Sequence, residues 1–174
     1  MISKAQLKKW DHKDTQALYK MYDNLPETED LTRVLGEIVQ SEPLTLPTIS
    51  WLMKHHLEKR QNSRIEKEPI INLFPMAKDW STRLHLLQIL PYLPLGTDDI
   101  EPLLPIIEDW LENEPNKFVK AWAYNALAIF TRLIPDLLPE TEERFSLALE
   151  EESPAVRARI RKAIKEQSLP ISFN

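Results

Sequence analysis

Cysteine is absent from the 174-residue chain, which excludes disulfides, cysteine-based zinc sites, iron–sulfur clusters and thiol catalysis. Glycine occurs only at Gly36 and Gly96, too rarely for a phosphate-binding loop or a dinucleotide-binding fingerprint. The same scarcity argues against a β-rich fold with many hairpin turns. No apolar run approaches the length of a membrane span, and the first ten residues contain no apolar signal-peptide core. We therefore expect a cytoplasmic protein that does not contact a membrane.

Helical periodicity dominates what is present. Apolar residues make up 43% of the chain and charged residues 28%, a balance typical of a folded domain. Most of the 14 prolines lie where an apolar pattern starts or stops, and between them apolar residues recur at spacings of three, four and seven. No useful stretch alternates apolar and polar residues. The sequence therefore predicts an all-α fold.

A 37-residue spacing separates Arg83, Lys120 and Arg157. In this register, three short polar residues suited to helix N-caps form a second column: Asp79, Asn116 and Ser153. Four apolar columns complete one helix face: Thr82/Val119/Val156, Leu86/Ala123/Ile160, Ile89/Ala126/Ala163 and Leu90/Leu127/Ile164. Agreement in six columns predicts that each copy is the second helix of a repeated helix hairpin.

The first helix of each hairpin is less regular. We expect one over residues 100–111, capped by Thr97, Asp98 or Asp99, with an apolar stripe formed by Ile100, Leu103, Leu104, Ile107 and Leu111. A second is expected to open at Asp136 and to bury Leu138, Phe145 and Leu149. A capping box of Ser63 and Glu66 predicts a third over residues 64–74.

The N-terminal half keeps the helical pattern but loses the register. One helix is expected near residues 27–40, with a stripe formed by Leu31, Val34, Leu35, Ile38 and Val39, and Pro47 is expected to begin the next. Residues 1–25 are expected to form N-terminal capping helices, the first capped by Ser3 and Gln6. Residues 167–174 are expected to be a tail, frayed or laid over the last repeat.

The repeated second helix resembles HEAT repeats. The matching residues are Val119-Lys120 and Val156-Arg157, followed by Ala126-Leu127 and Ala163-Ile164. Residues 80–94 look like repeats of the phosphatase scaffold subunit of that family. The resemblance covers about residues 63–166, and residues 26–60 weakly. It implies a right-handed α-α superhelix with the second helices on the concave side, and it implies binding to another protein without a particular reaction.

In that family, an acidic residue six positions before the basic one contributes to a ladder between repeats. Glu114 and Glu151 occupy this position, and Ala77 stands there in the first copy. Taken together, the chain is expected to be a single HEAT-like domain, residues 1–174, of about four helix hairpins with a 37-residue period in the C-terminal half.

Charge segregates along the repeats. Residues 98–115 hold seven acidic side chains and no lysine or arginine, whereas residues 153–165 hold five basic side chains and no acid. Since the second helices would line the concave face, we expect a positive strip that binds a partner protein or acidic peptide. The candidate partner-binding residues are Arg83, Leu87, Lys120, Trp122, Tyr124, Arg157 and Arg161. The competing interpretation is that the basic column only links repeats to one another.

An alternative function is nucleic-acid binding, because HEAT-like DNA alkylation-repair glycosylases have a cationic concave face. Their chemistry needs aromatic residues beside a carboxylate. Trp80, Trp122 and Tyr124 offer aromatic rings, but Asp79 is better interpreted as an N-cap. The net charge of −5 also disfavours nucleic acid.

Enzymatic chemistry finds no support in the sequence. Adjacent residues on a helix point about 100° apart, so His55 and His56 are expected to be polar surface rather than a zinc site. We expect a non-enzymatic scaffold or interaction module with no catalytic residue, no metal and no cofactor. The sequence leaves the identity of the partner and the oligomeric state open.

Overall fold

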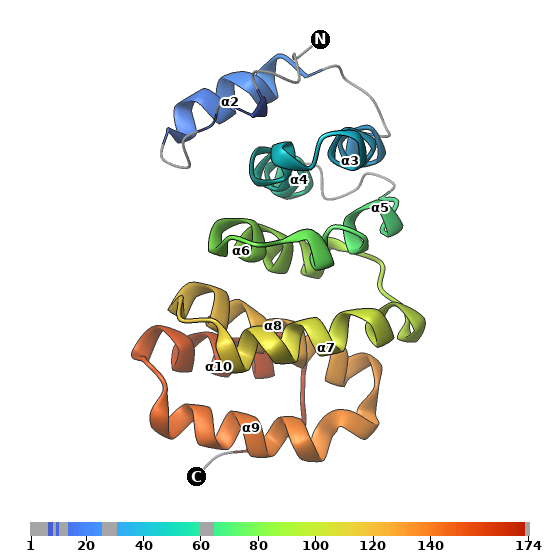
Figure 1. The fold of residues 1–174 in the computed structure, drawn as a ribbon. Coiled ribbons are helices and arrows are strands. Elements are labelled where there is room, and N and C mark those ends of the chain that lie inside the picture. Colours follow the sequence, from blue (N-terminus) through green and yellow to red (C-terminus); the bar gives the residue numbers. More distant parts are fainter. Residues whose placement is uncertain (1–6, 9, 11–13, 26–30, 60–64, 173–174) are drawn as a thin grey trace. The chain divides into compact units, whose positions relative to one another are not determined.

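Nine α-helices and no β-strand occur in the part of the chain that the computed structural model describes, residues 7–8, 10, 14–25, 31–59 and 65–172 (Figure 1). The predicted all-α fold is confirmed for these residues. Contacts between Cα atoms divide the chain into two units, residues 1–94 and 95–174, which are described separately. The expectation of a single domain stays a prediction.

Unit 1 contains five of the helices. They are α2 (Thr15–Asp23), α3 (Leu31–Ser41), α4 (Leu46–Lys59), α5 (Glu68–Ile71) and α6 (Trp80–Ile89), with 3-10 turns at Pro43–Thr45, Phe74–Met76 and Leu90–Tyr92. The most extensive packing is between α4 and α6, while α3 packs against α4 and α5 and α2 packs against α4. The predicted cap at Ser3 and Gln6 lies outside the described residues.

The buried face of α3 differs in part from the predicted stripe. Val34 and Ile38 are only half-buried, whereas Thr32 and Gly36 are buried beside the expected leucines. A Cβ atom on Gly36 would lie 3.0 Å from the Cβ of Pro69, so glycine permits the close approach of α5. The face is rotated because α3 contacts α5 as well as α4.

The predicted helix over residues 64–74 is shorter in the structure. Only Glu68–Ile71 is α-helical, and a 3-10 turn follows at Phe74–Met76. Pro75 disfavours a helical conformation at the residue before it and cannot donate a backbone hydrogen bond, so the helix ends before this position. Ser63, the predicted cap, lies outside the described residues.

Unit 2 contains two helix hairpins. Their helices are α7 (Thr97–Asn113), α8 (Lys117–Leu133), α9 (Leu138–Glu151) and α10 (Pro154–Glu166), with a 3-10 turn at Pro135–Leu137 before α9. The second helices α8 and α10 pack most extensively against each other, α7 packs against α8, and α9 contacts both α8 and α10. The predicted alternation of first and second helices is therefore present in unit 2.

The N-cap column is confirmed at two of its three positions. Asp79 Oδ1 accepts the N–H of Thr82 at 2.9 Å, and Asn116 Oδ1 accepts the N–H of Phe118 at 2.9 Å. Ser153 occupies the N-cap of α10, but its side chain makes no capping hydrogen bond. The N-cap of α7 was predicted wrongly. It is Gly96, whose N–H donates to Asp99 Oδ2 at 2.6 Å, so Asp99 acts from inside the helix.

The apolar columns are almost completely confirmed. Eleven of the twelve residues are buried, and only Ile164 is half-buried. The predicted stripe of α9 is confirmed at Phe145 alone. Leu138 and Leu149 are half-buried, and the buried face consists of Thr141, Phe145 and Ala148. Thr141 is compatible with burial because its hydroxyl hydrogen-bonds to that of Thr131 at 2.7 Å.

The tail is laid back on unit 2 rather than frayed at its described residues. Ser168 adopts a left-handed conformation with φ of 52°, and the N–H of Leu169 donates to the carbonyl of Ile164 at 3.0 Å. Together with the bond from Ser168 N–H to Lys165 O, this is a Schellman motif, which reverses the chain after α10. Leu169 and Ile171 are buried as a result.

The difference between the caps gives a stability prediction. Asn116→Ala should lower the free energy of unfolding by about 1 kcal/mol, because two backbone N–H groups lose their acceptor. Ser153→Ala should change it by less than about 0.5 kcal/mol, because the buried Ser153 Oγ has no hydrogen-bond partner to lose. Urea denaturation measures both variants. Equal losses of the free energy of unfolding in the two variants would contradict the conclusion that Asn116 caps its helix through its side chain and Ser153 does not.

Candidate functional site

Two of the predicted partner-binding residues lie in unit 1. Arg83 is half-buried, and its Nε donates to the carbonyl oxygen of Ala77 at 3.3 Å. This acceptor belongs to the position six residues before, where the family has an acidic side chain. Leu87 has no exposed surface, because α6 buries it in the core of unit 1. Leu87 therefore cannot contribute to a binding surface.

Lys120 joins the two hairpins of unit 2. Its Nζ lies 3.0 Å from Glu152 Oε1 at the end of α9. The acidic residue that the resemblance suggested, Glu114, instead is buried and accepts the N–H of Asn116 at 3.0 Å. For Lys120, the interpretation as a link between repeats therefore has direct geometric support.

Tyr124 belongs to the core of unit 2. Only 9% of the residue is exposed, and its ring meets the edge of Phe145 with the two centroids 5.8 Å apart. Burial raises the pKa of Tyr124 to about 12, and the nearby negative charge of Glu152 adds to the effect. The residue is thus held in its neutral form and offers little surface to a partner.

Trp122 is half-exposed and carries a cation on its ring. The guanidinium carbon of Arg159 lies 3.8 Å from the ring centroid, a cation–π contact between α8 and α10. Burial lowers the pKa of Arg159, although Glu166 acts in the opposite sense. Arg159 was not among the residues predicted from the sequence. It could have been found, because Arg159 follows Trp122 by 37 residues and the two occupy the same position in the 37-residue register.

Three cations on α10 form a stripe along one flank of the helix. Arg157, Arg161 and Lys165 are four residues apart, so they share one flank, and each is half-exposed or exposed. Among the residues that the structure describes, none of the three forms an ion pair. By contrast, Arg159 and Lys162 both reach Glu166, at 3.8 and 3.5 Å. We call Arg157, Arg161 and Lys165 the α10 cation stripe.

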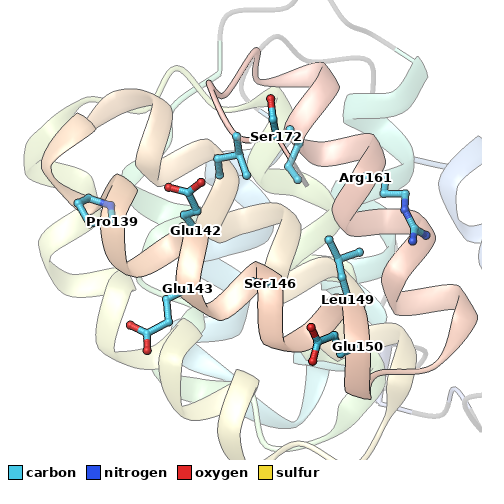
Figure 2. A pocket seen from close by; sticks show the side chains of 10 residues that line it. Pro139, Glu142, Glu143, Ser146, Leu149, Glu150, Arg161 and Ser172 are labelled. Atoms are coloured by element: carbon cyan, nitrogen blue, oxygen red, sulfur yellow. The ribbon is translucent and has the colours of Figure 1, made fainter. Parts of the chain in front are cut away.

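A groove of about 860 Å³ opens between α9, α10 and the tail (Figure 2). Its lining combines three carboxylates, one guanidinium, three aliphatic side chains and smaller residues: Glu142, Glu143, Glu150, Arg161, Leu149, Ile164, Ile171, Pro139, Ser146 and Ser172. Five of the lining residues project from α9, namely Glu142, Glu143, Ser146, Leu149 and Glu150. Arg161 lies on α10 across from them (Figure 2). We call this the end groove.

The expectation of polar surface at His55 and His56 is wrong. His56 is 4% exposed, and its Nδ1 lies 3.0 Å from the Tyr22 hydroxyl. The half-buried His55 ring stacks on Trp51 at a centroid distance of 4.9 Å and meets the edge of the Tyr22 ring at 4.7 Å. Burial, followed by the positive charge of Lys59, lowers the pKa of His55. Both histidines therefore pack α2 against α4.

Within the described ranges, no three His, Cys, Asp or Glu residues are placed to share a metal ion. No helix there is both long enough and apolar enough to cross a membrane. No family model, curated protein or solved structure matches the chain. The candidate surfaces are therefore defined by their geometry alone.

The environment of Tyr124 predicts the pH dependence of stability. A pKa raised from 10 to about 12 stabilises the folded state fully below pH 10, and this contribution is lost as the pH rises through 12. The wild type should therefore lose stability more steeply between pH 10 and pH 12 than Tyr124→Phe. Urea denaturation across this range measures the two slopes. Subtracting the absorbance titration of Tyr124→Phe from that of the wild type isolates Tyr124 among the four tyrosines, and a midpoint near 10 in this difference would contradict a pKa of about 12.

Proposed function

We propose that the chain is a non-enzymatic interaction module of HEAT-like helix hairpins that binds an acidic partner protein on the second-helix side of unit 2. The observation that carries the proposal is the α10 cation stripe: within the described residues, Arg157, Arg161 and Lys165 form no ion pair. The proposed architecture of the chain is a right-handed superhelix of helix hairpins.

The packing supports a repeated hairpin. In unit 2 the second helices α8 and α10 pack most extensively, and in unit 1 the corresponding pair is α4 and α6. Each second helix is preceded in the chain by a first helix: α7 precedes α8 and α9 precedes α10 in unit 2, and α3 precedes α4 and α5 precedes α6 in unit 1. A stack in which each hairpin contacts its neighbours is the arrangement of helical repeat proteins.

The local charge supports an acidic partner. Residues 153–165 carry five cations and no acid, and the one acid of α10, Glu166, lies against Arg159 and Lys162. The whole chain nevertheless has a net charge of −5. Charges beyond about 8 Å are largely screened at physiological salt, so a ligand at α10 experiences this local field. Guanidinium groups are suited to carboxylates because their donors match both oxygens of the acid.

The structure narrows the surface that the sequence suggested. Arg157 and Arg161 remain accessible, and Lys165 extends them. Lys120 is engaged with Glu152, Tyr124 is buried, and Arg159 lies over one face of Trp122. The half-exposed Trp122 remains available as a contact at the edge of the surface, since tryptophan is frequent among residues that dominate binding.

The alternative of DNA repair receives no comparable support. Trp80 is exposed, but the carboxylate of the adjacent Asp79 accepts three hydrogen bonds, from Thr82 N–H, Ser81 Oγ and Thr82 Oγ1. That carboxylate is committed to the cap of α6. Arg159 covers the Trp122 ring from one side, and the Tyr124 ring packs on Phe145. A base would need at least one such ring to be open beside an available carboxylate.

Reversing the stripe tests the proposal. The probe is a fluorescein-labelled synthetic peptide rich in Glu and Asp, measured by fluorescence anisotropy. The triple variant Arg157→Glu, Arg161→Glu, Lys165→Glu should bind at least about tenfold more weakly than the wild type, because attraction becomes repulsion. The matched variant Lys20→Glu, Lys78→Glu, Arg132→Glu has the same net charge and should lose less than about threefold.

Two outcomes would contradict the proposal. Equal losses in the two triple variants would mean that the peptide responds only to net charge. A DNA duplex that binds more tightly than the peptide at low salt, with an affinity that falls steeply as salt is added, would favour the nucleic-acid alternative. Affinity capture from lysate with the same three proteins then identifies the natural partner.

A further inference from the structure

The end groove continues a pattern that is already complete one hairpin earlier. Where α7 meets α9, the guanidinium of Arg144 on α9 lies 3.7 Å from Glu108 Oε1 and 3.7 Å from Glu112 Oε1 on α7. The second hairpin thus presents a cation to two acids on the face of the first. Arg144 also pairs with Glu140 in its own helix at 3.0 Å, which holds the side chain in position.

The same positions on α9 line the end groove. Glu114 is the C-cap of α7, and Glu152 is the C-cap of α9. Counting back from these caps, Glu150 corresponds to Glu112, and Ser146 corresponds to Glu108. Both Glu150 and Ser146 line the groove. Of the two acids that contact Arg144, Glu112 therefore has an acidic counterpart in the groove, Glu150, whereas Ser146 replaces Glu108.

The groove also has an apolar floor. Leu149 and Ile164 are half-buried and Ile171 is buried, although helix periodicity placed both Leu149 and Ile164 in the core. In the α7 hairpin, the residue corresponding to Leu149 is Leu111, which is 5% exposed. Leu149 thus remains half-buried where its counterpart is buried, and it leaves apolar surface at the groove.

The charge of the lining indicates which kind of ligand the end groove favours. The lining has three carboxylates, Glu142, Glu143 and Glu150, and one cation, Arg161. We propose that the end groove binds a basic amphipathic helix of a partner protein, with its apolar stripe on Leu149, Ile164 and Ile171 and an arginine or lysine at Glu150. This partner helix would place a cation at Glu150 as Arg144 places one at Glu112, using the helix-in-groove mode of recognition.

This proposal is independent of the acidic partner proposed above. The two surfaces adjoin at Arg161, but they prefer ligands of opposite charge. The volume of about 860 Å³ is within the range of grooves that accommodate several side chains, so a helix can insert its apolar stripe without displacing α10. An anionic probe and a cationic probe therefore distinguish the failure of one proposal from the failure of the other.

The test uses the full chain and a labelled synthetic helix of about four turns, cross-linked between side chains four residues apart. One version has a leucine and isoleucine stripe flanked by arginine, and a second replaces every arginine with glutamate. The arginine version should bind, and the glutamate version should bind at least about tenfold more weakly. Binding of neither version, or a preference for the glutamate version, would overturn the proposal.

A pair of neighbouring substitutions locates the site. Glu150→Lys should weaken binding of the arginine helix about five- to tenfold, because the carboxylate proposed to meet the arginine becomes a cation. Glu151→Lys changes the net charge equally but lies about 100° around the helix and does not line the groove, so it should weaken binding less than about twofold. Equal effects of the two variants would overturn the proposal.

A second copy of this chain is another occupant that must be distinguished from a partner helix. Sedimentation of the wild type alone across a range of concentrations, compared with Leu149→Arg, decides this point. Wild-type sedimentation independent of concentration supports a partner helix. Association that Leu149→Arg abolishes would show that the groove is covered by another copy and would overturn the assignment to a partner.

Discussion

Burial of the second helices determines where this molecule can present function. In unit 2, every residue of α8 from Ala123 to Thr131 is buried, and the helix contacts α7, α9 and α10. A side chain in that segment supports packing and leaves little surface for a ligand, which is why Tyr124 is held neutral in the core. On α8, the accessible side chains are therefore confined to its first turns and to its C-terminal end.

Much of this arrangement could be predicted because it is local or repeated. The caps at Asp79 and Asn116 follow from short polar side chains placed before helical patterns, and these bonds form within three residues. The apolar columns follow from periodicity combined with the 37-residue register. Phe145 is predictable for the same reason, since a large apolar residue in a helical stripe finds the core wherever the helix lies.

The features that could not be predicted depend on which neighbour a helix meets. Gly36 is buried because Pro69 approaches it, and no pattern within α3 announces that approach. His55 and His56 have a polar composition, but the rings of Trp51 and Tyr22 enclose them. Of the candidate surface, Arg157 and Arg161 are accessible as the register suggested. Leu87 and Tyr124 share their helical spacing but are buried, because spacing fixes a flank and not its exposure.

The charged residues that segregate along the sequence fall into two groups in the structure. One group forms ion pairs within unit 2, where Arg144 contacts Glu108 and Glu112, and Lys120 contacts Glu152. Such partly exposed pairs contribute little to the free energy of folding, about 0 to 1 kcal/mol each, but they disfavour a slipped register because a shift would oppose like charges. The rest lies at the α10 cation stripe and at the acidic wall of the end groove, and Arg161 belongs to both regions. The net charge of the chain is therefore a poor guide to the charge of either region.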